Sequence, residues 1–159
     1  MFNKKIKIPE PEEILEAMPM PAALKAIKQK RDRLVCDVIT GASDKLLMIV
    51  GPCSAHEEKP VLDYVERLGR LNERVKDRLV IVPRIYTNKP RTRGVGYKGM
   101  FSQPDPNKSE DILKGIFAIR ELNIKAIEAS GLTAADEMLY PSNIHYVDDL
   151  LSYAAVGAR

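Results

Sequence analysis

The sequence predicts an α/β protein in which parallel strands alternate with helices. Two short apolar runs, at 46–50 and 79–86, are each bounded by turn or charged residues, which is typical of buried strands. A stretch with apolar residues at helical spacing separates them, and the same alternation continues to residue 159. Strands that alternate with helices pair in parallel through right-handed crossovers. A doubly wound sheet and part of a (β/α)8 barrel both fit this order.

Residues 1–45 form a predicted N-terminal extension, distinct from the βα units expected over 46–159. The extension is rich in proline and glutamate, which allows only a short helix over 12–18. Apolar residues recur at helical spacing over 22–39 and predict an amphipathic helix. We expect Cys36 on its buried face and Arg31 on its exposed face. Gly41 ends this helix.

The elements of the remaining chain follow from the same patterns. Helices are expected over 57–75, from a cap at Ser109 to Ala129, and briefly over 146–151. A glycine- and proline-rich loop spans 88–107. Pro83 is unusual in a strand, because proline cannot donate to a ladder. The four strands are expected near 46–52, 79–86, 133–138 and 153–158, with neighbours in sequence order.

Composition excludes several classes of protein. The 159 residues suffice for one domain, and 25 basic against 22 acidic residues give a net charge of only +3, too small for a dedicated nucleic-acid or membrane-surface protein. The longest apolar run, Leu46–Val50, is far shorter than the roughly 20 residues of a membrane helix. The N-terminus also lacks the apolar region of a secretory signal. We therefore expect a cytoplasmic protein, in which Cys36 and Cys53 form no disulfide.

Polar side chains follow each predicted strand at its carboxyl end. Cys53 follows the first strand, Arg84 and Lys89 the second, Glu137 the third and Arg159 the fourth. In barrels and open sheets alike, ligands bind at the carboxyl ends of parallel strands. The alternative is that these residues only pair with one another at the surface. Four in register favour a site.

The predicted site is mainly basic. Cations outnumber carboxylates around it: Arg84, Lys89, Arg91, Arg93, Lys98 and Arg159. Arginine forks and lysine point charges bind phosphates and carboxylates, so a small, multiply anionic phosphorylated substrate is expected. A solvated basic loop is the alternative. Aromatic residues are too sparse for a nucleic-acid surface.

Cys53 lies in a Gly-Pro-Cys-Ser-Ala-His segment that allows several interpretations. It could be a nucleophile activated by His56, a ligand of a divalent metal, or a small inert residue. Position in the sequence does not choose between them. His145 is expected at the surface.

Four segments, in this order, resemble the type I 3-deoxy-7-phosphoheptulonate (DAHP) synthases: 51–56 (GPCSAH), 89–92 (KPRT), 96–99 (GYKG) and 157–159 (GAR). Gly-Pro-Cys is shared with the related 3-deoxy-octulosonate 8-phosphate synthases, and Lys-Pro-Arg-Thr favours the DAHP synthases. The resemblance covers 46–159 and implies the first half of a (β/α)8 barrel. The implied enzyme condenses phosphoenolpyruvate with erythrose 4-phosphate in the first step of the shikimate pathway, towards aromatic amino acids.

The resemblance also implies roles for individual residues. Cys53 matches a ligand of a divalent metal (Mn, Fe, Co or Zn), which polarises the aldehyde. Residues that match the phosphoenolpyruvate site are Arg84, Lys89, Lys98, Glu137 and Arg159, with Arg84 and Lys89 as the catalytic pair. Arg91 and Thr92 match the erythrose 4-phosphate side. A homo-oligomer with an aromatic amino acid effector is implied, although 141–145 departs from the best-known members where effector contacts fall.

Length is the largest departure, because a full barrel needs about 250 residues and this chain holds about four of eight units. The other metal ligands and further phosphate-binding cations of the family come from the second half. The chain alone is therefore expected to be inactive. A non-catalytic half-barrel that binds small phosphorylated anions or a partner chain is the alternative, as is a fragment of a 3-deoxy-octulosonate 8-phosphate synthase.

Overall fold

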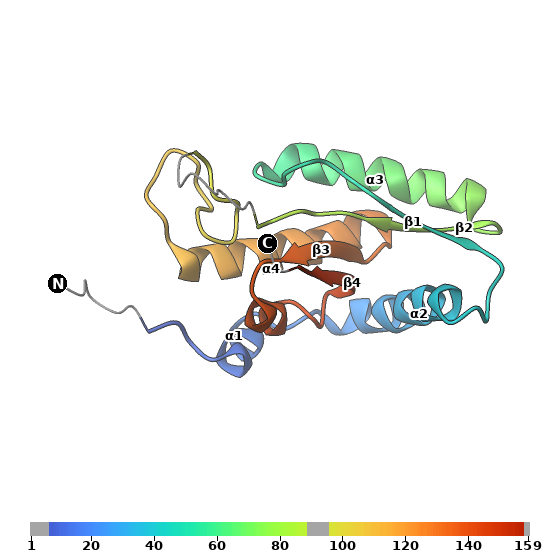
Figure 1. Cartoon of the computed structure of the whole chain (residues 1–159), viewed down its shortest axis with the longest axis horizontal. Coiled ribbons are helices and arrows are strands. Elements are labelled where there is room, and N and C mark those ends of the chain that lie inside the picture. Colours follow the sequence, from blue (N-terminus) through green and yellow to red (C-terminus); the bar gives the residue numbers. More distant parts are fainter. Residues whose placement is uncertain (1–6, 89–95, 158–159) are drawn as a thin grey trace.

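A computed structural model describes residues 7–88 and 96–157 of the chain (Figure 1). Parallel strands lie between helices, as the alternating sequence pattern predicts. The elements are, in order, α1 (Pro11–Ala17), α2 (Ala22–Ile39), β1 (Leu46–Val50), α3 (Glu58–Val75), β2 (Leu79–Pro83), α4 (Ile112–Ser130), β3 (Ala134–Met138), the 3-10 helix η1 (Pro141–Tyr146) and β4 (Leu151–Val156).

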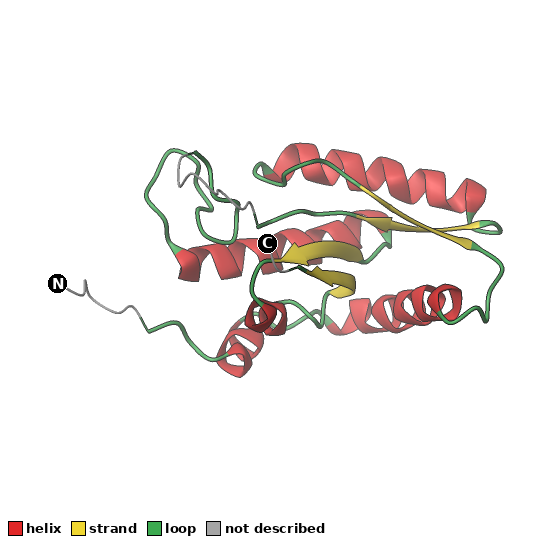
Figure 2. Cartoon of the chain, in the orientation of Figure 1, coloured by secondary structure: helices red, strands yellow, loops and turns green. Residues whose placement is uncertain are grey.

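The strands are parallel and follow sequence order. β1 pairs with β2 from Leu46↔Leu79 to Val50↔Pro83, and β3 pairs with β4. A single parallel bridge, Arg84↔Ala135, joins the two pairs just beyond β2. The second strand was expected to reach residue 86 but ends at Pro83. The strands point their carboxyl ends towards the same end of the molecule (Figure 2).

Helices cover both faces of the β1–β2 pair. α3 contributes Leu68 to a cluster with Ile81. α2 lies on the other face, where Val35 packs with Val80 and Val82 (Figure 1). The alternation along β2 thus sends successive side chains to opposite helices, as strand geometry requires.

Two expectations about α2 were wrong. Arg31 is buried, with 5% of its surface exposed, and its Nη2 donates to the Ile81 carbonyl oxygen of β2. The N-terminal part of β2 has no β3 partner in the described structure, so its carbonyls need another donor. Cys36 is exposed instead of buried, because the buried stripe of α2 runs through Leu24, Arg31 and Val35.

The ends of α4 show how local chemistry sets element boundaries. Asp111, and not Ser109 as expected, caps the helix, and its carboxylate accepts from the Lys114 amide at 3.0 Å. Gly131 ends the helix in the left-handed conformation, with φ of 66°.

The segment between β3 and β4 also differs from expectation. The helix predicted over 146–151 is instead a 3-10 helix over Pro141–Tyr146. Pro141 suits a first helical turn, because its φ is fixed and it needs no amide partner. β4 consequently begins at Leu151, earlier than the residue 153 that was expected.

A buried arginine fastens the N-terminal extension to the βα units. Arg120 of α4 is fully buried and donates to both carboxylate oxygens of Asp149, at 2.7 and 2.9 Å. It also donates to the Met18 carbonyl oxygen, between α1 and α2. Ile14 of α1 lies in the main apolar cluster with residues of α3 and α4. The described part of the extension therefore packs as one body with the rest.

Candidate functional site

The carboxyl ends of β1, β2 and β3 meet at Arg84. Its Nη1 donates to Glu137 Oε1 at 3.1 Å, and its Nη2 donates to the Pro52 carbonyl oxygen at 3.0 Å. The guanidinium carbon lies 5.2 Å from the centre of the Tyr86 ring. Three consecutive strand ends and one aromatic ring therefore fix the direction of this guanidinium.

Gly51 explains how the segment after β1 approaches Arg84 so closely. A Cβ on Gly51 would lie 2.0 Å from the Arg84 carbonyl oxygen, which no side chain can occupy. Further along, the Ala55 amide donates to the Tyr86 carbonyl oxygen at 2.8 Å. The glycine of the Gly-Pro-Cys segment is thus required by backbone packing, independently of any ligand.

The described site residues are not all in one place. Arg84 and Glu137 form the ion pair just described, with side chains 30% and 33% exposed. Cys53 is exposed and directly follows Pro52, whose carbonyl Arg84 contacts. Lys98 instead forms an ion pair with Glu110 at 2.5 Å. Lys89, Arg91, Thr92 and Arg159, together with Arg93, lie outside the described residues.

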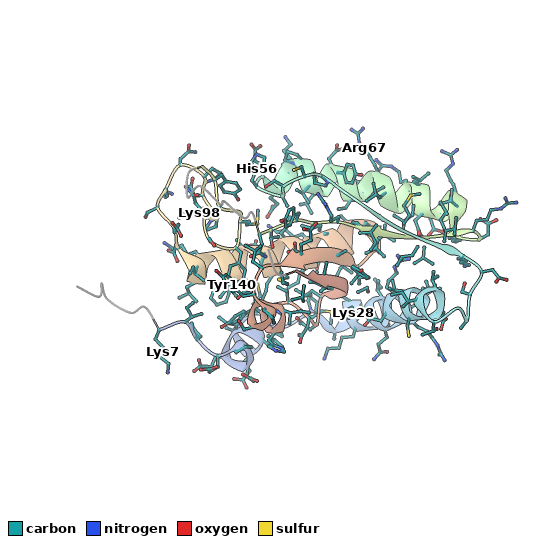
Figure 3. The ribbon with its side chains drawn as sticks, viewed as in Figure 1. Lys7, Lys28, His56, Arg67, Lys98 and Tyr140 are labelled. Carbon is teal, nitrogen blue, oxygen red and sulfur yellow. The ribbon has the colours of Figure 1, made fainter. Side chains whose placement is uncertain are left out.

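The loop that carries Lys98 nevertheless lies at the same end of the molecule. Figure 3 shows the Lys98 and His56 side chains beyond the carboxyl ends of the strands. The rings of His56 and Tyr97 pack edge to face, with centroids 5.7 Å apart. His56 is also 3.5 Å from Glu57. These contacts place the loop before α3 against the loop before α4.

A small cavity lies beside the ion pair. It has a volume of about 100 Å³, and its lining includes Tyr86, Glu137, Ala155 and Gly157. It therefore opens between the carboxyl ends of β3 and β4. A larger hollow of about 820 Å³ lies at the opposite end of the strands, around Lys45 and Arg78. We place the site by its chemistry, because the larger hollow contains none of the residues at the strand carboxyl ends.

The described residues do not form a metal centre by themselves. Across residues 7–88 and 96–157, no three His, Cys, Asp or Glu side chains are grouped so that they could hold an ion. A catalytic metal usually takes about three protein ligands. Cys53 is thus a candidate for one ligand of a site whose other ligands come from elsewhere.

Asp136, which the sequence did not single out, is 2% exposed and directly precedes the site residue Glu137 in β3. Its carboxylate accepts from the Thr87 amide at 3.0 Å, from the Thr87 hydroxyl, and from the Glu137 amide at 2.7 Å. Burial raises the pKa of Asp136 to about 7, although the Thr87 hydrogen bonds oppose that change. The available signal was a second carboxylate in β3, adjacent to Glu137 in a strand whose side chains alternate between its two faces.

The chain is similar to known proteins over most of its length. Residues 17–159 match the DAHP synthetase I family. The Trp-sensitive phospho-2-dehydro-3-deoxyheptonate aldolase of Enterobacter agglomerans is 44% identical over 139 residues, which cover 87% of this chain and 39% of that protein. The aldolase of Corynebacterium glutamicum is 34% identical over 162 residues, covering 99% of this chain and 43% of that protein.

A solved structure of the corresponding aldolase from Francisella tularensis superposes with a TM-score of 0.89 at 28% identity, and covers 100% of this chain and 46% of that one. The chain thus spans about two fifths of the length of these curated relatives. These relatives are enzymes, named as phospho-2-dehydro-3-deoxyheptonate aldolases. The chain belongs to the DAHP synthetase I family.

Proposed function

We propose that the chain is the N-terminal part of a metal-dependent DAHP synthase, which condenses phosphoenolpyruvate with erythrose 4-phosphate. In this proposal β1 to β4 form the first half of a (β/α)8 barrel over 46–159, preceded by the extension 1–45. The four parallel strands in sequence order support this, as does the superposition on an aldolase of about twice the length. The remaining strands would be supplied by a further stretch of chain.

The observation that carries the proposal is the arrangement of Arg84. Two of its nitrogens are held by Glu137 and the Pro52 carbonyl, so the guanidinium is oriented before any ligand arrives. Its Nε is buried and has no hydrogen-bond partner among the described residues. A buried donor without a partner is costly, whereas an oxygen of a bound carboxylate or phosphate would satisfy it.

The roles of the other site residues follow from family membership. Lys89 would act with Arg84 on phosphoenolpyruvate, and Lys98 and Arg159 would contribute further positive charge. Arg91 and Thr92 would contact erythrose 4-phosphate. Glu137 neutralises Arg84 in the absence of substrate, so the attraction for a multiply charged anion depends on the cations of 89–93 and on Arg159.

We further propose that Cys53 is one ligand of a divalent metal (Mn, Fe, Co or Zn), which in this family would polarise the aldehyde as a Lewis acid. The ligand set is incomplete in the described residues, so the chain alone is expected to lack turnover. An aromatic amino acid effector and a homo-oligomeric enzyme are also proposed. Two relatives are named as Trp-sensitive and Tyr-sensitive enzymes, which supports an aromatic amino acid effector.

The second candidate is a non-catalytic half-barrel that binds small phosphorylated anions, in which the oriented Arg84 guanidinium would hold the anion without a reaction. Calorimetric titration of the chain with phosphoenolpyruvate tests the anion site, which both candidates share, and turnover once a complementing second barrel half is supplied would favour the enzyme over the non-catalytic candidate. Weak, salt-dependent binding is expected, and Arg84→Ala should abolish it. Arg33 is exposed, so Arg33→Ala is the control. Equal behaviour of the two variants would show that the site is misplaced, and turnover by the chain alone would overturn the expected inactivity.

A further inference from the structure

The segment from Arg84 to Asn88 is held by backbone hydrogen bonds from several loops at once. The Ala55 amide donates to the Tyr86 carbonyl at 2.8 Å, and the Phe101 amide donates to the Thr87 carbonyl at 3.2 Å. On the β3 side, the Ile85 amide donates to the Ala135 carbonyl at 2.9 Å. The loops before α3 and before α4 are thus both positioned by this short segment.

The segment is no longer a regular strand, so its position needs side-chain support. β2 ends at Pro83, and the only bridge beyond it is Arg84↔Ala135 in the described structure. From residue 85 onward, the pairing with β3 supplies only the hydrogen bond from the Ile85 amide to the Ala135 carbonyl oxygen among the described residues. It supplies no hydrogen bond to Thr87. Asp136 fills that role, because its carboxylate accepts from both the amide and the hydroxyl of Thr87.

Asp136 is connected to the site on both sides. The same carboxylate accepts from the Glu137 amide, and the Glu137 carboxylate accepts from Arg84. On the other side, Asn88 Nδ2 donates to the Thr87 hydroxyl at 3.3 Å, immediately before the Lys-Pro-Arg-Thr motif. A change at Asp136 therefore reaches Arg84 through two short routes, one along β3 and one along 85–87.

We propose that Asp136 is a positioning residue of the anion site, which acts through Thr87 to hold the Arg84–Asn88 segment against β3. This inference rests on the proposed anion site at Arg84. It assigns Asp136 no contact with substrate. Asp136 differs from Glu137 in two ways. Its side chain is buried, whereas that of Glu137 is one-third exposed, and its carboxylate accepts hydrogen bonds from Thr87 and the Glu137 amide.

The charge state of Asp136 should change the affinity of the site for an anion, which a purely structural role would leave unchanged. Its pKa is raised to about 7, mainly by burial and in small part by the neighbouring charge of Glu137, while the facing groups Thr87 and Asn88 carry no charge. Ionised Asp136 can accept from both Thr87 donors. Protonation converts one acceptor into a donor and weakens that hold. Affinity for an anion should therefore fall as pH falls through about 7.

The test uses sulfate as the probe, because its charge does not change over this pH range. Asp136→Asn is nearly isosteric and mimics the neutral carboxyl. We expect it to weaken sulfate binding roughly threefold to tenfold above pH 7, as losing a charge-assisted hydrogen bond would. It should also remove the pH dependence that the unmodified chain shows. His56→Gln removes the imidazole at the same end of the molecule and should leave the pH dependence in place.

Asp149→Asn is the matched control, because it makes the same substitution in a partly buried ion pair with Arg120, away from the site. It should lower stability without changing sulfate affinity. If Asp136 acts through Thr87, combining Asp136→Asn with Thr87→Val should weaken binding no further than either change alone. Three results would each overturn the proposal. They are a sulfate affinity of Asp136→Asn equal to that of the unmodified chain, sulfate binding that tightens at low pH in the unmodified chain but not in Asp136→Asn, and additive effects of Asp136→Asn and Thr87→Val.

If the unmodified chain binds no sulfate, that result counts against the anion site itself. Two NMR measurements then still decide whether Asp136 is a positioning residue. Asp136→Asn should increase hydrogen exchange of the Thr87 amide and shift the Arg84 Nε–Hε resonance, whereas Asp149→Asn should do neither. Unchanged Thr87 exchange and Arg84 resonance would overturn the positioning role. Thr87→Val serves as the second variant if Asp136→Asn fails to fold, with the same shift expected at Arg84.

Discussion

At the scale of single residues, Gly51 and Asp136 show what the sequence reveals and what it conceals. The Gly-Pro-Cys segment draws attention for its cysteine, yet the structural demand is on its glycine. Asp136 lies next to the predicted site residue Glu137, but its burial could not be predicted from the sequence. The burial of a carboxylate depends on which residues pack over it. Arg31 was misjudged for the same reason, since its position within α2 does not show that a carbonyl of β2 lacks a partner.

Gly51→Ala should destabilise the chain by about 3 kcal/mol or more, because the new methyl would overlap the Arg84 backbone. The backbone of Arg84 cannot move away without breaking the hydrogen bond from its amide to the Val50 carbonyl oxygen, at 2.9 Å. Urea denaturation measures the loss. Gly157→Ala is the control, since its Cβ would meet nothing within 4 Å. Equal stabilities for the two variants would contradict the close approach.

Asp136 should also give the stability of the chain a defined pH dependence. The ordinary value of this pKa is 3.8, and the folded chain raises it to about 7. The folded state thus binds this proton more tightly than the unfolded state, so the contribution of Asp136 to stability is greatest at low pH, falls between about pH 4 and 7, and is flat above. The contribution is at most about 4 kcal/mol. Chemical denaturation of the chain and of Asp136→Asn across this range should show that the substitution removes this slope.

At the scale of elements, periodicity predicted most of the fold. The helices expected over 22–39 and 57–75 appear within a residue of these bounds, and the strand expected near 46–52 ends two residues early, at Val50. Long periodic stretches and apolar runs next to glycine or proline are strong local signals. The failures fall where local signals are weak. The region 141–151 has few residues with clear periodicity, and its course is decided by Pro141 and by the burial of Arg120 against Asp149.

The site was predictable to a similar degree. Convergence of Arg84 and Glu137 follows from parallel strands in sequence order, which the alternation of elements already implies. The position of Lys98 does not follow, since it lies on a long loop whose conformation depends on contacts such as the ion pair with Glu110. Residues on strand ends could thus be placed from sequence, whereas residues on loops could not.

The contact between α2 and β2 is open to a direct test. Arg31→Met keeps much of the buried volume but leaves the Ile81 carbonyl oxygen without its donor. A buried acceptor without a partner costs roughly 1–3 kcal/mol, so the variant should unfold at lower denaturant concentration. Arg33→Ala on the exposed side of the same helix should change stability by less than about 0.5 kcal/mol. A neutral Arg31→Met would mean that this hydrogen bond contributes little to the docking of α2.

At the scale of the whole molecule, the outer edges of β1 and β4 carry no further strand in the described structure. β1 exposes Leu46, Met48 and Ile49, with 69%, 44% and 37% of their surface accessible, and β4 exposes Val156 at 52%. No helix of the described residues is long and apolar enough to cross a membrane. Strand edges with apolar side chains are sites where further strands pair.

We therefore expect the chain to associate at micromolar concentration through these edges when nothing follows residue 159. Sedimentation velocity should show dimers or larger species whose proportion rises with concentration. Leu46→Lys combined with Met48→Lys places charge on the β1 edge and should shift the chain towards monomer, because a buried lysine without a partner opposes edge pairing. Matched substitutions to lysine at Ile39 and Leu71, which are exposed at 61% and 40% on the outer helices, should leave association unchanged. A folded, monodisperse monomer at these concentrations would contradict the expectation and would indicate that the open edges are protected within the chain itself.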